Sequence, residues 1–435
     1  MFRERVMVSK TPLLSCFDSF SNVNTQNVLS LITKETVKDA LSHINQAVNH
    51  TPMVETPWLS KKIKGSVHLK LENMQVAGSF KARGVYLKLL SLSEEQKKRG
   101  VITISTGNHA LGVAHQAQLM SVNATIVMPE NTSFSKVENV RHYGASVILQ
   151  GRHMLESRDF ALQLVKKHGY TMIHPFDDPY IIAGQGTVGL EVMEQTPNLE
   201  TLIIPIGGGA LAAGICIAAK AINPQIHIIG VQSEFCPATA EILFPNVLPT
   251  ERCFLTKSLA ESMNVQFPGE LTLSILAEHL DDCLVIPEKY IELAIESLID
   301  RSKIVAEGAG ALGVACLLYA PNLFRGKQVG TFISGGNIGA KDLADVLSRS
   351  HKDKGCLMRY QIDTADTPAT LGQLSYIIGK AGGQIFELSQ KKTLNKISAK
   401  TTSIKAVIET RNTQHAHDVF QALVSNGFAA QMLEE

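Results

Sequence analysis

Apolar runs separated by glycine-rich turns recur along most of the chain. Val101–Ile104 (VITI), Thr201–Ile206 (TLIIPI) and Val329–Ile333 (VGTFI) are short, apolar and rich in β-branched residues, which is typical of strands buried inside a sheet. Apolar residues with helical spacing follow the first two runs, at Ala110–Met120 and Leu211–Ile222. Strands that alternate with helices in this way predict an α/β fold with a mostly parallel sheet covered by helices.

The pattern changes after a polar segment, Ser348–Gly355 (SRSHKDKG), which predicts a linker. Six shorter elements follow, in the order strand, helix, strand, strand, helix, strand. They are predicted at Met358–Asp363, Thr370–Ala381, Gln384–Leu388, Ser403–Glu409, His415–Ser425 and Ala430–Leu433. This βαββαβ order is that of a ferredoxin-like unit, so the chain is predicted to hold a separate C-terminal domain.

Composition narrows the classes of function without selecting one. The 435 residues are 45% hydrophobic and 19% charged, with a net charge of +1, which gives no electrostatic basis for binding nucleic acid or a membrane surface. No apolar run approaches the ~18–20 residues of a membrane-spanning helix. The N-terminal segment is a poor signal peptide. The seven cysteines form no CxxC pair, which favours reduced thiols and a cytoplasmic location.

One lysine stands in a context suited to covalent chemistry. Lys81 lies in the run Gly78–Gly84 (GSFKARG), after a predicted strand at Ser66–Glu72 and before a helix. A lysine enclosed at such a junction loses solvation, which lowers its pKa and makes its amine a nucleophile for carbonyl compounds. A solvated lysine at a helix start is the ordinary alternative, since most lysines lie on the surface. The remaining turns of the chain decide between the two.

Three further turns carry groups that bind small anionic molecules. Ser105–Ala110 (STGNHA) offers hydroxyls, an amide and backbone N–H groups at a helix start, which suits a carboxylate. Gly207–Leu211 (GGGAL) opens a helix after a strand, and its glycines let backbone N–H groups approach a phosphate. Ser334 follows the strand that ends at Ile333, at the edge where open α/β sheets bind ligands. Each turn taken alone is also consistent with an ordinary cap or connection.

Together with Ala183–Glu191 (AGQGTVGLE), these segments in this order resemble the threonine/serine dehydratase family of pyridoxal-phosphate enzymes. The resemblance covers about residues 35–345 and implies the two-lobed fold type II, similar to that of the tryptophan synthase β subunit. The C-terminal unit then resembles an ACT regulatory domain. The domains that this implies are an N-terminal extension at 1–33, a catalytic domain at 34–348 with its small lobe at about 75–170, a linker at 349–356 and an ACT-like domain at 357–435.

The resemblance assigns a role to each segment. Lys81 matches the Schiff-base lysine, Phe80 lies against the cofactor, and Asn108 hydrogen-bonds the cofactor's 3′-oxygen. Ser334 matches the partner of the pyridine nitrogen, and Glu307 matches a carboxylate near the cofactor. The phosphate cradle matches Gly207, Gly208, Gly209, Ala210 and Leu211, with Ala210 where the family usually has a fourth glycine. The loop that grips the substrate carboxylate matches Ser105, Thr106, Gly107, Asn108 and His109.

The activity implied by the resemblance is elimination of water from L-threonine, and from L-serine, to give 2-oxobutanoate or pyruvate and ammonia. Lys81 then takes the Cα proton, and pyridoxal 5′-phosphate spreads the charge that forms. Thr106 stands where serine racemases carry a catalytic serine, so racemisation stays open. An ammonia-lyase for another β-hydroxy amino acid, such as 3-hydroxyaspartate, and a non-catalytic amino-acid sensor stay open as well. A threonine dehydratase would serve isoleucine biosynthesis or threonine catabolism.

The resemblance also implies partners. The turn Asp366–Leu371 matches the place where ACT domains bind amino acids, which implies an allosteric effector. ACT units usually pair side by side, which implies a homodimer or homotetramer. Family members that hold a divalent cation use acidic residues where this chain has Gln232 and Ala238, so no metal site is expected.

Overall fold

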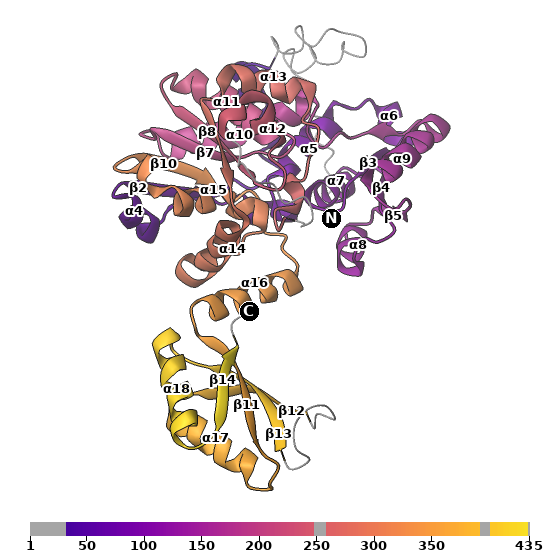
Figure 1. Cartoon of the computed structure of the whole chain (residues 1–435). Coiled ribbons are helices and arrows are strands. Elements are labelled where there is room, and N and C mark those ends of the chain that lie inside the picture. The colour runs from indigo at the N-terminus through magenta and orange to yellow at the C-terminus, as the bar shows by residue number, and fades with distance from the viewer. Residues whose placement is uncertain (1–31, 248–257, 392–400, 434–435) are drawn as a thin grey trace, which may run out of the picture. The chain divides into compact units, whose positions relative to one another are not determined.

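The computed structural model describes residues 32–247, 258–391 and 401–433, so the N-terminal extension predicted at 1–33 lies almost wholly outside it. Two compact units divide the chain between Ile338 and Gly339 (Figure 1). Each unit contains both helices and strands. Within the described ranges, no helix is both long and apolar enough to cross a membrane.

A six-stranded sheet forms the centre of the larger unit. Its strands, in spatial order, are β1 (Met53–Glu55), β2 (Ser66–Lys70), β10 (Gln328–Phe332), β7 (Thr201–Pro205), β8 (His227–Ser233) and β9 (Asp282–Ile286). β1 runs antiparallel to β2, and the remaining neighbours are all parallel. The sheet is therefore mostly parallel, as the alternating elements of the sequence predict.

Helices surround this sheet. They are α3 (Lys34–Ile44), α4 (Pro57–Ile63), α5 (Lys81–Ser91), α10 (Pro179–Gln195), α11 (Ala210–Ile222), α12 (Ala238–Leu243), α13 (Glu270–His279), α14 (Glu288–Ser297) and α15 (Gly308–Tyr319). Both α11 and α15 contact β7, in which every residue is buried. A strand covered in this way has no polar face, which explains its uninterrupted apolar sequence.

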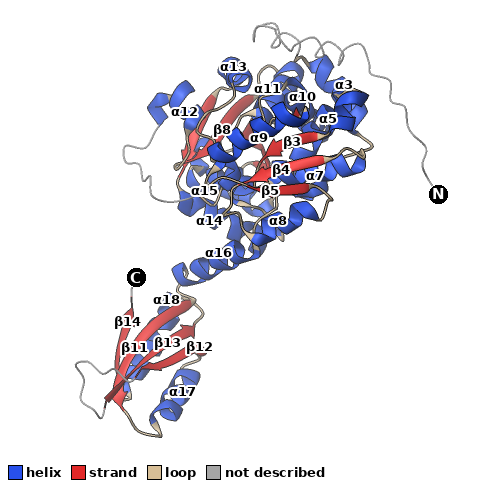
Figure 2. Cartoon of the chain, turned by 90° about the vertical axis from the view of Figure 1, so that its right-hand side faces the viewer, coloured by secondary structure: helices blue, strands red, loops and turns tan. Residues whose placement is uncertain are grey.

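A second, all-parallel sheet forms a smaller lobe within the same unit. Its strands, in spatial order, are β5 (Ser146–Leu149), β4 (Ala124–Met128), β3 (Val101–Ile104) and β6 (Thr171–Met172). Its helices are α6 (Glu94–Arg99), α7 (Asn108–Leu119), α8 (Phe134–Arg141) and α9 (Met154–His168). Figure 2 shows β3, β4 and β5 side by side, with helices around them. The lobe carries the segment that follows β3, which the sequence assigns to the substrate carboxylate.

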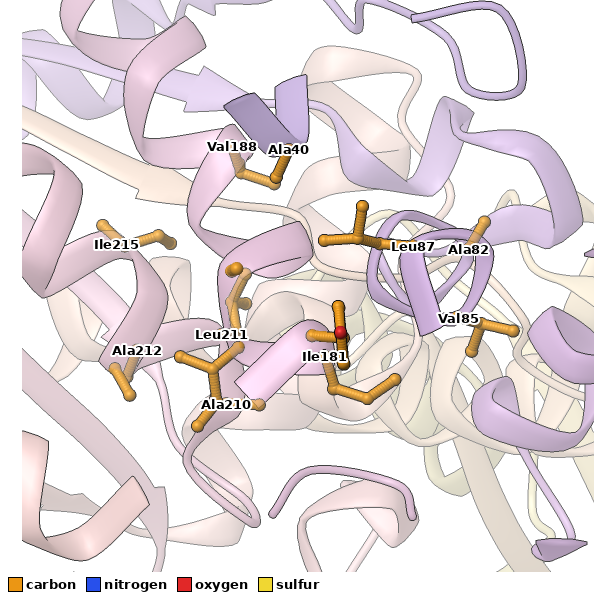
Figure 3. Close-up of a cluster of buried hydrophobic side chains, with 14 of the residues drawn as sticks. Ala40, Ala82, Val85, Leu87, Ile181, Val188, Ala210, Leu211, Ala212 and Ile215 are labelled. Atoms are coloured by element: carbon orange, nitrogen blue, oxygen red, sulfur yellow. The ribbon is translucent and has the colours of Figure 1, made fainter. Parts of the chain in front are cut away.

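Glycines bring α10 into backbone contact with the helices on either side of it. A Cβ on Gly184 would lie 2.5 Å from the Cα of Gly84 in α5, and a Cβ on Gly214 in α11 would lie 2.5 Å from the backbone nitrogen of Gly186. Apolar side chains from α3, α5, α10 and α11 fill the space around these contacts (Figure 3). The glycines of the AGQGTVGLE stretch therefore have a packing role, because side chains would separate the three helices.

The C-terminal unit has the ferredoxin-like order of elements. They are β11 (Leu357–Ala365), α17 (Thr370–Lys380), β12 (Gln384–Lys391), β13 (Thr401–Glu409), α18 (Thr413–Ser425) and β14 (Ala429–Leu433). The strands form one antiparallel sheet in the order β12-β13-β11-β14, with the helices packed on it (Figure 2). Tyr360, Ile362 and Ile404 from the sheet pack with Leu374 and Val419 from the helices. The predicted fold class, a two-lobed α/β core plus a ferredoxin-like unit, is confirmed.

The segment predicted as a polar linker at 349–356 is partly helical. Helix α16 (Ala340–Asp353) includes its first five residues, so this part of the predicted linker is regular structure. On this helix Val346 is buried and Leu343 and Leu347 are half-buried, whereas most charged residues are exposed. A helix that buries so few apolar residues looks like a linker in the sequence, because its polar face dominates the pattern.

Candidate active site

Lys81 is the first residue of α5 and its amine is enclosed by protein. The Nζ atom donates a hydrogen bond to the carbonyl oxygen of Pro175 at 2.7 Å and lies 5.2 Å from the centre of the Phe80 ring. Burial lowers the pKa of Lys81 to about 8, although the nearby carboxylate of Glu307 opposes this shift. About a tenth of the amine is therefore unprotonated at pH 7, far more than in a solvated lysine, and the unprotonated amine is the state that forms covalent bonds with carbonyl carbon.

The Ser334 segment lies against the segment that precedes Lys81. The backbone N–H of Phe80 donates to the carbonyl of Ser334 at 3.2 Å, and that of Gly336 donates to Gly78 at 3.0 Å. Gly78 has a φ of +73°, and its ideal Cβ would lie 2.4 Å from the Oδ1 atom of Asn337. The two motifs meet because β2 and β10 are parallel neighbours that end side by side. Ser334 itself is buried, 3% exposed, just beyond the end of β10.

Asn108 and Glu307 face one another beside these segments. The Nδ2 atom of Asn108 donates to Oε1 of Glu307 at 2.5 Å, and its Oδ1 atom accepts from Nδ2 of Asn337 at 2.7 Å. The hydroxyl of Ser262 also donates to Oε1 of Glu307, at 3.3 Å. Burial raises the pKa of Glu307, against the effect of these two donors. Asn108 is thereby held in one orientation at the start of α7.

The Ser105–His109 segment connects β3 to α7. The hydroxyl oxygen of Ser105 accepts from the backbone N–H of Gly107 at 3.2 Å, and Thr106 is half-buried beside it. The Nε2 atom of His109 lies 3.1 Å from the carbonyl oxygen of Ile173. Because a carbonyl only accepts, Nε2 carries the proton.

His109 is a neutral side chain that points into the protein. Burial, with a contribution from the charge of Lys81, lowers the pKa of His109 to about 3. The imidazole therefore offers no positive charge to an anionic substrate. The hydroxyls, the Asn108 amide and the N–H groups at the start of α7 are the donors that remain for a carboxylate in this segment.

The three glycines after β7 form a turn that leads into α11. Gly209 is the N-cap of α11 and has a φ of +95°, a conformation that favours glycine. A Cβ on Gly208 would lie 2.1 Å from the ring of Phe176, and the Gly208 carbonyl accepts from Oγ1 of Thr272 at 2.8 Å. Ala210 is already helical, so the methyl group that replaces the usual fourth glycine causes no backbone strain.

The segment Ile173–Phe176 also belongs to the site, although no sequence motif marks it. It contacts His109 through the carbonyl of Ile173, Lys81 through the carbonyl of Pro175, and Gly208 through the ring of Phe176. The segment is irregular, so no periodic pattern marks it. The signal available was its position, because it follows β6 at the edge where parallel strands present ligand-binding loops.

Comparison with known proteins identifies the family. A model of the family described as pyridoxal-phosphate dependent enzymes matches residues 44–335. The chain belongs to this family. Its members hold pyridoxal phosphate, so the chain is a pyridoxal-phosphate enzyme and the cofactor predicted from the sequence is confirmed.

Similar proteins share most of the length of this pyridoxal-phosphate enzyme. The L-threonine ammonia-lyase of Thermotoga maritima is 36% identical over 403 residues, which are 93% of this chain and 100% of that protein. The catabolic L-threonine dehydratase TdcB of Staphylococcus aureus strain N315 is 40% identical over 331 residues, 75% of this chain and 95% of that protein. Among solved structures, maize serine racemase has a TM-score of 0.67 and 31% identity, over 74% of this chain and 98% of that one.

The residues of the site fit the cofactor. The turn Gly207–Gly209 presents backbone N–H groups without side chains at the start of α11, where the helix dipole favours a phosphate. Lys81 supplies an amine with a lowered pKa, and Ser334 supplies a buried hydroxyl at the end of β10. The site thus offers N–H groups for the phosphate, an amine for the aldehyde and a hydroxyl for the pyridine ring.

Gln232 lies at the end of β8, at the position where the resemblance leads us to expect an acidic residue in members that hold a cation. The Nε2 atom of Gln232 donates to the carbonyl of Ile206 at 3.1 Å, and its Oε1 atom accepts from the N–H of Ala240 at 2.8 Å. In the part of the chain that the structure describes, no three His, Cys, Asp or Glu side chains are grouped as metal ligands.

Proposed function

We propose that this pyridoxal-phosphate enzyme dehydrates and deaminates L-threonine, and L-serine as a second substrate. The observation that carries the proposal is the match to an L-threonine ammonia-lyase over 93% of this chain and the whole of that protein. The match of 403 residues extends beyond the larger unit, so both compact units have a counterpart in that enzyme. The products are 2-oxobutanoate from L-threonine, pyruvate from L-serine, and ammonia.

In this proposal the residues of the site have separate tasks. The N–H groups of Gly207–Leu211 hold the phosphate, Asn108 and Ser334 fix the ring, and Phe80 packs against it. When bound, the cofactor withdraws electrons from the Cα atom of the amino acid joined to it. The amine of Lys81 then accepts the Cα proton, which its pKa of about 8 allows.

The residue at the ring nitrogen favours elimination. Ser334 is a neutral hydroxyl and cannot stabilise a charged ring nitrogen as a carboxylate would. With the cofactor bound, negative charge at Cα would be stabilised only briefly, which would favour loss of the β-hydroxyl group. The proton taken from Cα and this hydroxyl group together make up the water that is eliminated. Transamination, which needs a longer-lived charge, is disfavoured for the same reason.

The test is formation of 2-oxo acid by the purified, cofactor-loaded protein from L-threonine, L-serine and 3-hydroxyaspartate in parallel assays. Rapid formation of 2-oxobutanoate from L-threonine supports the proposal. Turnover of 3-hydroxyaspartate alone would instead assign the ammonia-lyase to that substrate. Binding of amino acids without any turnover would contradict an enzyme and favour a sensor.

Serine racemisation is a second candidate activity. Thr106 retains a hydroxyl in the segment after β3, and maize serine racemase has the same fold with 31% identity. We expect D-serine to form from L-serine and to disappear in Thr106→Ala, because the alanine lacks the hydroxyl that would act as the second acid–base group. Chiral chromatography of the same reactions measures the D-serine formed. If the unaltered protein forms no D-serine, racemisation is excluded.

We further propose that the C-terminal unit binds an amino-acid effector and that the protein is a homodimer or homotetramer. The turn Asp366–Leu371 between β11 and α17 is the proposed effector site. There the hydroxyl of Thr370 donates to the carbonyl of Ala365 at 2.9 Å and lies 2.8 Å from that of Thr367. Size-exclusion chromatography with light scattering tests the oligomeric state, and a monomer would contradict it.

A further inference from the structure

A cluster of four buried charges lies directly behind the catalytic lysine. Arg83 is two residues after Lys81, in the first turn of α5, and is fully buried. Glu72 and Lys70 are also fully buried, and Glu191 is 2% exposed. We call these four residues, Lys70, Glu72, Arg83 and Glu191, the buried charge cluster. Nothing in the proposed reaction uses them directly.

Arg83 is bound to Glu72 through a bidentate contact. Its Nε atom donates to Oε2 of Glu72 at 2.8 Å, and its Nη2 atom donates to Oε1 at 2.7 Å. Such planar pairs fix both distance and orientation, which a lysine ammonium does not. Glu72 follows β2 in a short 3₁₀ turn, and its Oε1 atom also accepts from the hydroxyl of Thr51 at 2.5 Å. The contact therefore ties the first turn of α5 to the end of β2.

The other side of the Arg83 guanidinium binds α10. Its Nη1 atom donates to Oε1 of Glu191 at 2.6 Å and to the hydroxyl of Thr187 at 3.2 Å, and Nη2 donates to Oε2 of Glu191 at 3.0 Å. Lys70 completes the cluster, because its Nζ atom donates to Glu191 at 2.5 Å, to Gln195 at 2.9 Å and to the carbonyl of Thr51 at 2.7 Å. The side chains of the cluster thus join three separate elements, β2, α5 and α10.

Holding a helix in place with buried charges costs desolvation free energy. Two cations and two anions give no net charge, but each charge has lost its solvation. Apolar residues of similar volume usually stabilise an interior as well or better. What the charges supply instead is a single geometry, since only one placement satisfies every donor of Arg83. This argues for a role in position rather than in stability.

The surroundings already limit the motion of α5 to small shifts. The backbones of Gly84 and Gly184 are in contact where α5 crosses α10. On the other side, an ideal Cβ on Gly112 of α7 would lie 3.4 Å from the Cβ of Lys81. These contacts fix how closely the helices approach, but glycine surfaces permit rotation and sliding along the helix axis. The hydrogen bonds of Arg83 to Glu72 on one side and to Glu191 on the other oppose both movements.

We propose that Arg83 is a positioning residue, which sets the rotation of the first turn of α5 and thereby aims the Lys81 amine at the cofactor and the substrate Cα. This inference rests on the proposed function. A displacement of about 1 Å at a reacting group costs about 100-fold in rate. A change in the contacts of Arg83, two residues after Lys81, is therefore expected to have a large kinetic effect.

The experiment compares Arg83→Lys with the unaltered full-length, cofactor-loaded protein. The lysine keeps the positive charge but loses the planar contacts to Glu72 and Glu191. The matched control is Arg325→Lys, because Arg325 is exposed. For each protein we would measure cofactor content, kcat per bound cofactor, KM, the visible circular dichroism of the bound cofactor and Tm.

Positioning predicts a specific set of changes in Arg83→Lys. The kcat per bound cofactor falls about 10- to 100-fold while KM changes less than about threefold, because substrate binding is unaffected and proton transfer is misaligned. The visible circular dichroism changes sign or amplitude, since it reports how the ring is held. Arg325→Lys behaves as the unaltered protein. A lower Tm with unchanged kcat per bound cofactor and unchanged dichroism would overturn the proposal and assign the cluster to stability alone.

Glu72→Gln is the second variant, for the case that Arg83→Lys does not fold. It keeps the shape of the carboxylate and one acceptor, and it leaves Arg83 in place. We expect the same signature with a smaller fall in kcat, and a kcat within about twofold of the unaltered protein would contradict the proposal. If the unaltered protein turns over no amino acid, the proposed function fails, whereas the dichroism comparison still decides whether Arg83 positions Lys81.

Discussion

At the scale of single residues, Lys81 has a measurable effect on stability as well as on chemistry. Its pKa in the folded protein is about 8, below the ordinary value of 10.5. Between these two pH values the unfolded chain binds more protons than the folded one, so stability rises with pH across that window. Below pH 8 both states are protonated and the folded protein carries the full cost of the enclosed charge.

We therefore predict that Lys81→Met removes a pH dependence. From pH 8 to pH 10.5 the cofactor-free unaltered protein gains up to about 3 kcal/mol that the variant does not gain, less any solvent screening of the half-buried side chain. Urea unfolding of both proteins at a series of pH values measures the difference. Parallel stability curves over this range would contradict the shifted pKa of Lys81. The variant also loses cofactor that borohydride can trap.

The glycine turn allows a second prediction at this scale. Gly208→Ala places a Cβ 2.1 Å from the ring of Phe176, and the displaced loop can no longer present its N–H groups to the phosphate. We expect cofactor affinity to fall by at least about 10-fold, which corresponds to about 1.4 kcal/mol.

The control for Gly208→Ala lies in the same loop. Ala210→Gly restores the fourth glycine at a helical position, so we expect cofactor affinity within about threefold of the unaltered protein and a loss of about 1 kcal/mol in stability. Equilibrium dialysis of the cofactor measures both variants. Equal affinities for Gly208→Ala and the unaltered protein would show that the turn does not hold the phosphate.

At the scale of elements, the crossing of α5 and α10 depends on glycine. Gly184→Ala puts a methyl group 2.5 Å from the Cα of Gly84, a backbone atom that cannot give way. We expect a destabilisation of about 1–3 kcal/mol or more, with separation of the two helices. Differential scanning calorimetry and kcat measure the two effects.

Gly379→Ala in α17 is the control for this change. Its ideal Cβ has no neighbouring atom within 4 Å, so the substitution should stabilise the C-terminal unit by about 0.5–1 kcal/mol through helix propensity. If the two alanine variants behaved alike, the close approach at Gly184 would not be a constraint.

The sequence predicts elements with strong periodicity and misses those that tertiary contacts determine. The strands at 101–104 and 201–205 and the elements of the C-terminal unit are each marked by an apolar pattern. The strand predicted at Ser66–Glu72 ends instead at Lys70, because Glu72 turns inward to meet Arg83. Arg83 lies in α5, so the pattern of apolar residues in β2 cannot indicate this contact.

The same distinction applies to the site. Lys81, Asn108 and Ser334 lie in motifs with an unusual density of glycine, serine and asparagine, and a resemblance of these motifs to a known family can be recognised. Ser262 and Pro175 contribute one hydroxyl and one carbonyl from irregular segments. A carbonyl belongs to every residue, so no residue type can reveal it, and only the fold brings these groups to Glu307 and Lys81.

At the scale of the whole molecule, the division into two units predicts separable activity and control. We expect removal of residues 357–435 to leave turnover of L-threonine intact and to abolish its response to isoleucine or valine, because the larger unit holds all residues of the candidate active site. Initial rates with and without each effector measure this. A truncated protein that responded as the full chain does would place the effector site in the larger unit.

The parallel pairing of β2 with β10 also governs how the chain acquires its shape during synthesis. Ser66 stands opposite Gln328, which follows it by 262 residues. Closing so long a loop costs entropy before any contact compensates for it, which slows folding. The strands of the smaller lobe come from residues 101–172 alone, so we expect this lobe to fold first. Lys81 and the Ser334 segment therefore meet only after β10 has left the ribosome, so pyridoxal phosphate finds its complete site only when nearly the whole larger unit has been made.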